Sequence, residues 1–204
     1  MTIRLHRGDL PDLSRYKDSV AIDTETMGLN PHRDRLCVVQ ISPGDGSADV
    51  IQIAPGQKKA PNLVSLLRNR AITKLFHYGR FDIAVLYNAF GVMAEPVFCT
   101  KIASRLTRTY TDRHGLKDLC NELLGIGLSK AQQSSDWAAE TLSPEQLEYA
   151  ASDVLYLHRL RDVLATRLAR EGRTKEADAC FRFLPTRAKL DLMGWAEEDI
   201  FAHS

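Results

Sequence analysis

The stretch VAIDTETMGL, residues 20–29, places two acidic side chains directly after a run of apolar ones. Its first three residues are typical of a buried strand. Asp23 and Glu25 follow two residues apart, and side chains at i and i+2 of a strand lie on the same face. The two carboxylates are therefore expected side by side, where they repel each other. The stretch predicts a counter-charge near them, supplied either by basic side chains or by a metal ion.

The composition of the whole chain is that of an ordinary globular protein. It has 204 residues, of which 44% are hydrophobic and 26% charged, and this length suits one domain. The net charge of +1 provides no broad basic surface for long nucleic acids. A local site that binds a few phosphates is still compatible with it.

The cysteines and the apolar segments indicate the compartment. No two of the four cysteines form a C-x-x-C pair, which argues against a zinc site and favours reduced thiols. The N-terminal residues lack the apolar segment of a signal peptide, and no apolar run is long enough to span a bilayer. We expect a cytoplasmic protein without a membrane partner.

The first half of the chain predicts a sheet. The β-branched runs at residues 20–25, 36–42 and 49–54 are separated by short turn segments, which favours an antiparallel meander. Residues 61–70 are then predicted as a helix and residues 72–79 as a strand, and a helix over residues 80–91 follows. This order indicates a mixed sheet with helices packed on it.

The second half of the chain predicts helices. Apolar residues recur at helical spacing over residues 100–108, 115–125, 143–172 and 174–193. Ser143, Pro144 and Gln146 suit the N-cap, N1 and N3 positions of the long third segment, and they complete a capping box. The predicted fold class is α/β, a mixed sheet flanked by helices with a helical C-terminal half.

A third acid, Asp82, closes the motif HYGRFD at residues 77–82. It falls in the first turn of the predicted helix, where a carboxylate also stabilises the helix terminus. The preceding strand brings this helix start to the edge of the sheet where functional groups usually gather. His77 is a weaker candidate, because a lone histidine near a strand end is more often structural.

A fourth acid, Asp153, lies four residues after Tyr149 on the long helical segment, so the two share one helix face. The residues around them are mostly apolar, and an acid on such a face needs a partner. One interpretation is a simple hydrogen bond between the tyrosine and the aspartate.

Taken together, the four carboxylates lack a matching set of buried basic residues, and divalent metal resolves this conflict. Hard oxygen ligands suit Mg²⁺ or Mn²⁺. Two such ions about 4 Å apart can hold the in-line attack of water on a phosphodiester. Tyr149 could orient the attacking water, since a hydroxyl with a pKa near 10 is a poor base.

The combined pattern resembles the DEDD exonucleases, which have a ribonuclease H-like fold. D-x-E at Asp23 and Glu25, Asp82 after an Arg-Phe pair, and Y-x-x-x-D ending at Asp153 carry the resemblance. A tyrosine four residues before the last aspartate marks the DEDDy branch. The segment QQSSDWAAETLSPEQLEYAASDVLYL, residues 132–157, is similar to ribonuclease D.

Ribonuclease D proper carries helical nucleic-acid-binding domains after its catalytic domain, and this chain ends before them. Residues 1–204 are therefore expected to form a single exonuclease domain with no additional nucleic-acid-binding domain. The chain resembles the stand-alone bacterial group called nanoRNase C, also at residues 32–40, 100–117 and 199–204. This resemblance implies removal of nucleotides from the 3′ end of short RNA, down to dinucleotides. It also implies a homo-oligomer, a ring-shaped octamer, and activity on DNA ends in some members.

The resemblance also assigns roles to individual residues. Asp23, Glu25, Asp82 and Asp153 become the ligands of two Mg²⁺ or Mn²⁺ ions, and Tyr149 positions the water and contacts substrate. The substrate-binding residues are then Thr24, Leu29, His77 and Tyr149. Leu29 would be an apolar wedge between the last two bases, since leucine contacts a base face without reading its identity. The alternative is a turn residue that packs inward.

Other features have more ordinary interpretations. Lys101, Arg105 and Arg108 share a helix face that could meet phosphates, but a solvated face is favoured. Residues 135–137 are expected to serve packing and helix capping. Trp195 and Phe201, near the end of the chain, are expected to dock on their own domain or on a neighbouring subunit.

Three functions are consistent with these patterns. The first is a metal-dependent 3′–5′ exoribonuclease for short oligoribonucleotides. The second is a broader 3′–5′ exonuclease that trims structured RNA or DNA ends. The third is a catalytically inactive module on the same fold that binds nucleic acid or supports assembly. The intact acids and Tyr149 argue against the third.

Overall fold

The computed structural model describes residues 1–129 and 131–203, so Ser204 of the terminal motif lies outside it. Six strands form one sheet in the order β1-β4-β3-β2-β5-β6. The strands are β1 (Thr2–Arg7), β2 (Ser19–Thr26), β3 (Leu36–Ser42), β4 (Ser47–Gln52), β5 (Thr73–Phe76) and β6 (Val97–Cys99). The start of the stretch at residues 20–29 lies on a central strand, β2, where Val20, Ala21 and Ile22 are fully buried.

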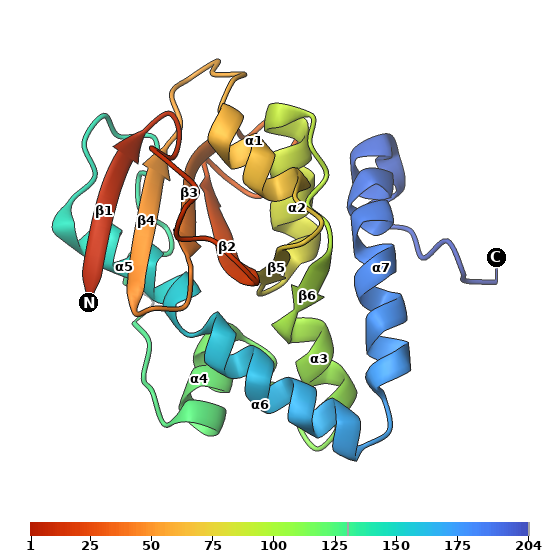
Figure 1. Cartoon of the computed structure of the whole chain (residues 1–204). Helices are drawn as coiled ribbons and strands as arrows, with labels where there is room; N and C mark the ends of the chain where they lie inside the picture. The colour runs from red at the N-terminus through yellow and green to blue at the C-terminus, as the bar shows by residue number, and fades with distance from the viewer. Residues whose placement is uncertain (130, 204) are drawn as a thin grey trace.

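Helices cover both faces of this sheet (Figure 1). Their bounds are α1 (Pro61–Arg68), α2 (Gly79–Phe90), α3 (Thr100–Thr107), α4 (Leu116–Leu124), α5 (Pro144–Leu155), α6 (Leu157–Arg170) and α7 (Thr174–Leu190). Helices α1 and α2 pack on one face, and α5 crosses the other face over β2, β3 and β4. Helix α7 stands beside α2 and β6 at one edge of the sheet, and β1 forms the opposite edge (Figure 1).

The predicted antiparallel meander is confirmed. Strand β3 pairs antiparallel with both β2 and β4, and its register sets Asp23 opposite Gln40. On its other side β2 pairs parallel with β5, so the sheet is mixed as predicted. The parallel pairing brings the carboxyl ends of β2 and β5 to the same edge of the sheet, next to the start of α2.

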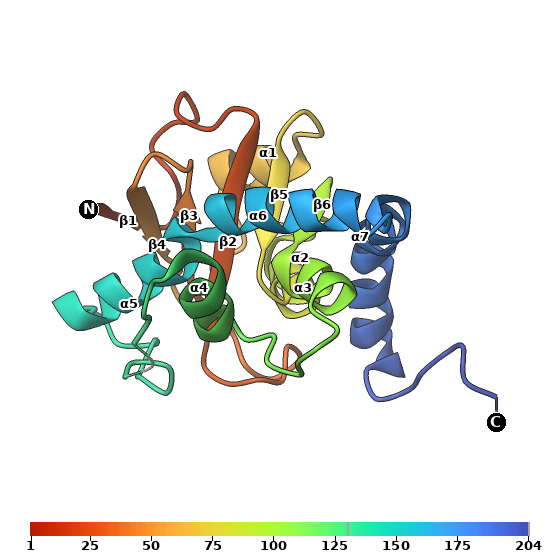
Figure 2. The same ribbon diagram turned by 90° about the horizontal axis from the view of Figure 1, so that it is seen from below.

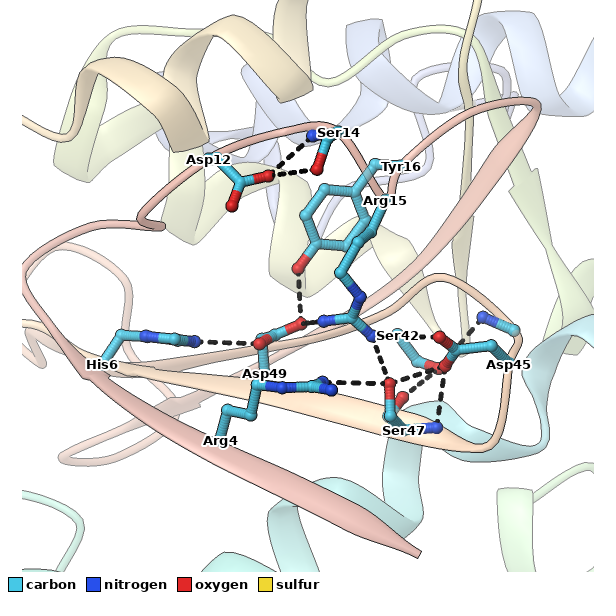
Figure 3. Close-up of polar contacts among 11 residues, drawn as sticks. Arg4, His6, Asp12, Ser14, Arg15, Tyr16, Ser42, Asp45, Ser47 and Asp49 are labelled. Atoms are coloured by element: carbon cyan, nitrogen blue, oxygen red, sulfur yellow. Dashed lines mark hydrogen bonds and ion pairs between the residues drawn. The ribbon is translucent and has the colours of Figure 1, made fainter.

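The sequence patterns missed the edge strand β1, because its side chains are mostly exposed. Its backbone pairs in parallel with β4, and Arg4 and His6 add polar contacts to Ser47 and Asp49 (Figure 3). Asp49 on β4 is buried and accepts hydrogen bonds from Tyr16 at 2.7 Å and Arg15 at 2.8 Å, and His6 on β1 lies 2.8 Å from it. Strand β6 was missed because three residues are too few to show a period.

The long helix predicted over residues 143–172 is wrong in one respect, because it is broken at Tyr156 into α5 and α6. The two halves pack on different surfaces. Helix α5 buries small side chains against the sheet, whereas α6 buries a leucine row against α3 and α4. The axis must turn between them, and Figure 2 shows α6 crossing the end of the sheet. The predicted capping box of Ser143 and Gln146 is confirmed.

The chain after α7 continues as a π-helical turn, Asp191–Trp195, and a short tail. Arg80 and Arg187 both donate to Asp191, and both also donate to backbone carbonyls of the tail. The first part of the tail, residues 195–198, is therefore held against its own domain by these two arginines. Phe201 remains 78% exposed. Among the described residues, no helix combines the length and the apolar character needed to cross a membrane.

The expected solvated face of Lys101, Arg105 and Arg108 is wrong for Arg108. Its guanidinium is fully buried and donates to Ser104, to the Arg113 carbonyl and to Glu122. Arg108 ends α3, where the chain turns back toward α4, so the ion pair ties these two helices together.

Replacing Glu122 with glutamine is expected to lower the free energy of unfolding by about 2 kcal/mol. The change leaves the buried Arg108 guanidinium without its counter-charge, and the partial exposure of Glu122 keeps the loss below that of a fully buried pair. Urea unfolding measures it. In the control, Glu171→Gln, the partner Arg170 is mostly exposed and the loss should stay below about 0.5 kcal/mol. Equal losses in both variants would contradict the role given to Arg108.

Candidate active site

Three carboxylates meet at the carboxyl end of β2. Asp23 and Glu25 project from one face of this strand, and Asp153 projects from α5, which lies on that face. One oxygen from each lies within 4.8 Å of the others. The side-by-side placement expected from the i, i+2 spacing is therefore present, and Asp153 joins it from a distant part of the chain.

Asp82 approaches from the other side of the strand, in the first turn of α2. Its side chain is only 3% exposed, and its Oδ1 accepts a hydrogen bond from the Thr24 hydroxyl at 2.7 Å. It lies outside the tight group of three, yet its charge contributes to raising the pKa of Asp23. Gly79 permits this helix start, because a Cβ there would lie 2.7 Å from the Cβ of Phe76.

The four acids are crowded and lack basic partners. None of them forms an ion pair within residues 1–129 and 131–203. Burial, followed by mutual repulsion, raises the pKa of Asp23 well above its usual range and that of Glu25 to about 9. Burial likewise raises the pKa values of Asp82 and Asp153 to about 7. Of the two counter-charges considered for this stretch, basic side chains are therefore not the one present, because no described lysine, arginine or histidine forms an ion pair with these acids.

Tyr149 lies one helical turn before Asp153 on α5. Burial first, and then the charges of Asp153, Glu25 and Asp23, raise the pKa of its hydroxyl. The hydroxyl therefore stays protonated and acts as a hydrogen-bond donor rather than as a base. Its ring packs on Trp137 with the centroids 6.0 Å apart, and Trp137 is buried.

Asp23, Glu25 and Asp153 line an open cleft of about 510 Å³, and Asp82 lies outside this lining. Its walls come from β2, the turn after it, α5 and the loop before α5. The lining residues are Asp23, Thr24, Glu25, Thr26, Met27, Gly28, Leu29, Phe81, Gln133, Ser134, Ser135, Trp137, Tyr149 and Asp153. Leu29 is 86% exposed at this cleft. The alternative in which Leu29 packs inward is therefore wrong.

Two predicted substrate-binding residues occupy less direct positions. Thr24 lines the cleft, but its hydroxyl is engaged with Asp82. His77 is not part of the cleft lining, and its Nδ1 lies 2.9 Å from the Thr100 hydroxyl. Burial lowers the pKa of His77 to about 3, so the ring is neutral near pH 7. Contact of either residue with substrate stays a prediction.

The sequence patterns missed two sets of contacts that support the site. Gln146 donates to the Ser135 hydroxyl at 2.8 Å and to the Asp136 carbonyl at 3.0 Å, which ties the loop to the start of α5. The packing role expected for residues 135–137 holds for Trp137, which is buried against Tyr149, whereas Asp136 is exposed; Trp137 also lines the cleft. Gln40 was missed as well. It donates to Asp23 Oδ2 at 2.7 Å, and a single polar residue inside the apolar run LCVVQIS was the available signal.

Comparison with known proteins agrees with this geometry. A family model described as 3′–5′ exonuclease matches residues 10–169. The chain belongs to this 3′–5′ exonuclease family. Ribonuclease D of Acidiphilium cryptum is 38% identical over 154 residues, which are 76% of this chain and 39% of that protein. The chain thus spans about two fifths of the length of this curated relative.

Solved structures of other proteins are similar to most or all of the chain. Brucella melitensis NrnC with bound Mg²⁺ is 75% identical with a TM-score of 0.97, and 100% of both chains is covered. The same Brucella protein has also been solved bound to pGG. Escherichia coli RNase D, an exoribonuclease involved in structured RNA processing, is 28% identical with a TM-score of 0.75, over 86% of this chain and 46% of that one.

The donor set of this candidate site fits a divalent metal. Three carboxylate oxygens converge, a fourth acid lies close by, and hard oxygen ligands of this kind suit Mg²⁺ or Mn²⁺. The raised pKa values show how costly it is to ionise the acids together without a cation. A metal ion, rather than an arginine or lysine, is therefore the counter-charge that residues 20–29 require.

Proposed function

We propose that this chain is a metal-dependent 3′–5′ exoribonuclease that hydrolyses short oligoribonucleotides, down to dinucleotides, to 5′-mononucleotides. Asp23, Glu25, Asp82 and Asp153 hold two Mg²⁺ or Mn²⁺ ions. The observation that carries the proposal is the convergence of the carboxylates with Tyr149 in a cleft next to the exposed Leu29.

The side chains around the cleft account for the hydrolysis. When bound, divalent ions lower the pKa of water and neutralise charge on the leaving oxygen. The protonated Tyr149 hydroxyl orients the attacking water toward phosphorus. Attack breaks the bond between phosphorus and the 3′ oxygen of the penultimate nucleotide, so the last nucleotide leaves with its 5′ phosphate. Packing of Tyr149 on Trp137 fixes the ring for this task.

The proposed preference for short substrates has two supports. The cleft of about 510 Å³ lies in the size range of small-ligand sites, which is compatible with binding of one or two nucleotides. The Brucella relative has been solved with pGG, a dinucleotide. The competing proposal is a broader exonuclease that trims structured RNA or DNA ends, and the likeness to Escherichia coli RNase D favours it.

A time course on two 5′-labelled RNAs separates these proposals. A heptamer and a dinucleotide are incubated with the wild-type chain and Mg²⁺. We expect the dinucleotide to disappear much faster than the heptamer shortens. If the heptamer shortens stepwise while dinucleotides accumulate, the chain is a broader exonuclease. If neither RNA changes, the chain is an inactive binding or assembly module.

Replacing Tyr149 with phenylalanine is expected to slow hydrolysis by about 100-fold and to leave Mn²⁺ affinity unchanged. The ring still packs on Trp137, and only the hydroxyl that orients the water is lost. Single-turnover hydrolysis and calorimetric Mn²⁺ titration measure the two effects. Full activity of the variant would refute the role of the hydroxyl.

Replacing Leu29 with alanine is expected to raise KM for the dinucleotide about 10-fold with little change in kcat. Contact between an apolar side chain and a base face contributes about 1–3 kcal/mol. The fold should be unaffected because Leu29 is 86% exposed. Met27, 62% exposed on the same turn, provides the matched control Met27→Ala, for which a smaller change is expected. Equal effects of both variants would argue against a wedge at Leu29.

We also propose that the chain assembles as a homo-oligomer, an octamer by family likeness, and works in the cytoplasm. Phe183, Met193 and Phe201 leave apolar surface exposed around α7 and the tail, and a second copy would cover it. All four cysteines are unpaired, as expected in a reducing compartment. Light scattering of the purified protein should give the mass of an oligomer, and a monomer at micromolar concentration would contradict the assembly.

A further inference from the structure

Gln40 touches the proposed metal site from a neighbouring strand. It lies on β3 directly opposite Asp23 in the antiparallel register, and its side chain is fully buried. Its Nε2 donates a hydrogen bond to Asp23 Oδ2 at 2.7 Å. An aspartate that binds metal is ionised and only accepts hydrogen bonds, so the amide nitrogen is the end of the glutamine that must face it.

The other end of the amide has no such partner. Gln40 Oε1 is buried, and no donor within residues 1–129 and 131–203 reaches it. A buried acceptor without a donor destabilises the folded state, and a residue kept only for stability would have both ends bonded. The hydrogen bond from Gln40 Nε2 to Asp23 therefore explains the glutamine better than a contribution to sheet stability does.

A neutral donor suits a carboxylate that must also bind a cation. Lysine or arginine at this position would fix Asp23 equally well, but the added positive charge would compete with the metal ion. An amide fixes the orientation of the carboxylate and leaves its full charge for the metal. Hydrogen bonds of this kind to metal-binding carboxylates orient the ligand and strengthen metal affinity.

We propose that Gln40 is a positioning residue that fixes the Asp23 carboxylate in the orientation needed for metal binding. This role presupposes the proposed metal-dependent hydrolysis, and Gln40 itself touches neither substrate nor the reacting atoms. It predicts that removal of the amide weakens metal affinity without weakening the metal-free fold.

The test compares Gln40→Met and Gln40→Leu with a matched variant, Ser42→Ala. Ser42 lies two residues further along β3, is also fully buried and donates to the Ser47 carbonyl at 2.7 Å rather than to an acid. Each protein is titrated with Mn²⁺ by calorimetry, melted without metal, and assayed for dinucleotide hydrolysis over a range of Mn²⁺ concentrations.

Both Gln40 variants are expected to bind Mn²⁺ about 10-fold more weakly, within the range known for residues that orient metal ligands. Their metal-free Tm should stay close to that of the wild type, because removal of the unpaired Oε1 offsets loss of the hydrogen bond to Asp23. Hydrolysis should fall at low Mn²⁺ and recover as Mn²⁺ is raised. Ser42→Ala should have a lower Tm and wild-type Mn²⁺ affinity.

Wild-type Mn²⁺ affinity in both Gln40 variants would overturn the positioning role and leave the proposed function standing. An equal loss of affinity in Ser42→Ala, or failure of both Gln40 variants to fold, would show that Gln40 is structural and also overturn it. If the wild-type chain neither binds Mn²⁺ nor hydrolyses RNA, the proposed function fails, and the positioning role fails with it.

Discussion

Replacing Asp153 with asparagine is expected to reduce hydrolysis by more than about 100-fold while the protein stays folded. Loss of residues that only orient metal ligands reduces affinity or activity by about 10–100-fold, so loss of a ligand should exceed that range. Asparagine keeps the shape of the side chain, and one fewer charge among crowded acids relieves repulsion. The metal-free variant should therefore melt at a higher temperature than the wild type near pH 8.

The matched control is Glu148→Gln on the same helix. Glu148 is exposed and is not part of the cleft lining, so its replacement should leave hydrolysis and Mn²⁺ binding unchanged. Single-turnover assays and metal-free melting curves of the wild type, Asp153→Asn and Glu148→Gln measure the hydrolysis rate and Tm of each protein. An Asp153→Asn variant that hydrolyses RNA at the wild-type rate would remove Asp153 from the site.

Excess Mn²⁺ is expected to raise Tm by more at about pH 8 than at about pH 5.5. In the unfolded chain the four acids have pKa values near 4. In the folded chain the pKa values of Asp82 and Asp153 are raised to about 7 and that of Glu25 to about 9. Between these limits the folded state binds more protons than the unfolded state, so the contribution of these groups to metal-free stability falls as pH rises.

Mn²⁺ replaces those protons, so its affinity and its stabilising effect grow over the same pH range. Melting curves with Mn²⁺ and with a chelator, at both pH values, measure the difference. Asp153→Asn should show a smaller Mn²⁺ effect, and Glu148→Gln should behave like the wild type. An Mn²⁺ effect that is the same at both pH values would mean that the ion binds away from the acids.

Much of the fold could be predicted because local patterns agree with the tertiary structure. The β-branched runs and their short turns indicated the meander, and the capping box marked the start of α5. The break at Tyr156 could not be predicted, because apolar spacing continues through it and only the packing surface changes. Strand β1 was missed since its side chains are mostly exposed, and it is attached to the sheet by backbone pairing with β4 and by the contact between His6 and Asp49.

In the site, too, features set by local sequence could be predicted, and features set by tertiary packing could not. The spacing of Asp23 and Glu25 within one strand fixes their shared face, so their side-by-side placement could be predicted. Arg108 was misread, because helical spacing does not show that a charged side chain is buried against an acid of the next helix. Gln40 was missed since its role depends on strand register, which sets it opposite Asp23.

Anomalous diffraction from crystals soaked in MnCl₂ shows whether the four acids bind metal, because it locates the ions without reference to activity. We expect anomalous peaks within bonding distance of Asp23, Glu25 and Asp153, with Asp82 beside them, and weaker peaks in Asp153→Asn crystals treated in the same way. Wild-type crystals with no peak at these carboxylates, or with Mn²⁺ only elsewhere on the chain, would contradict it.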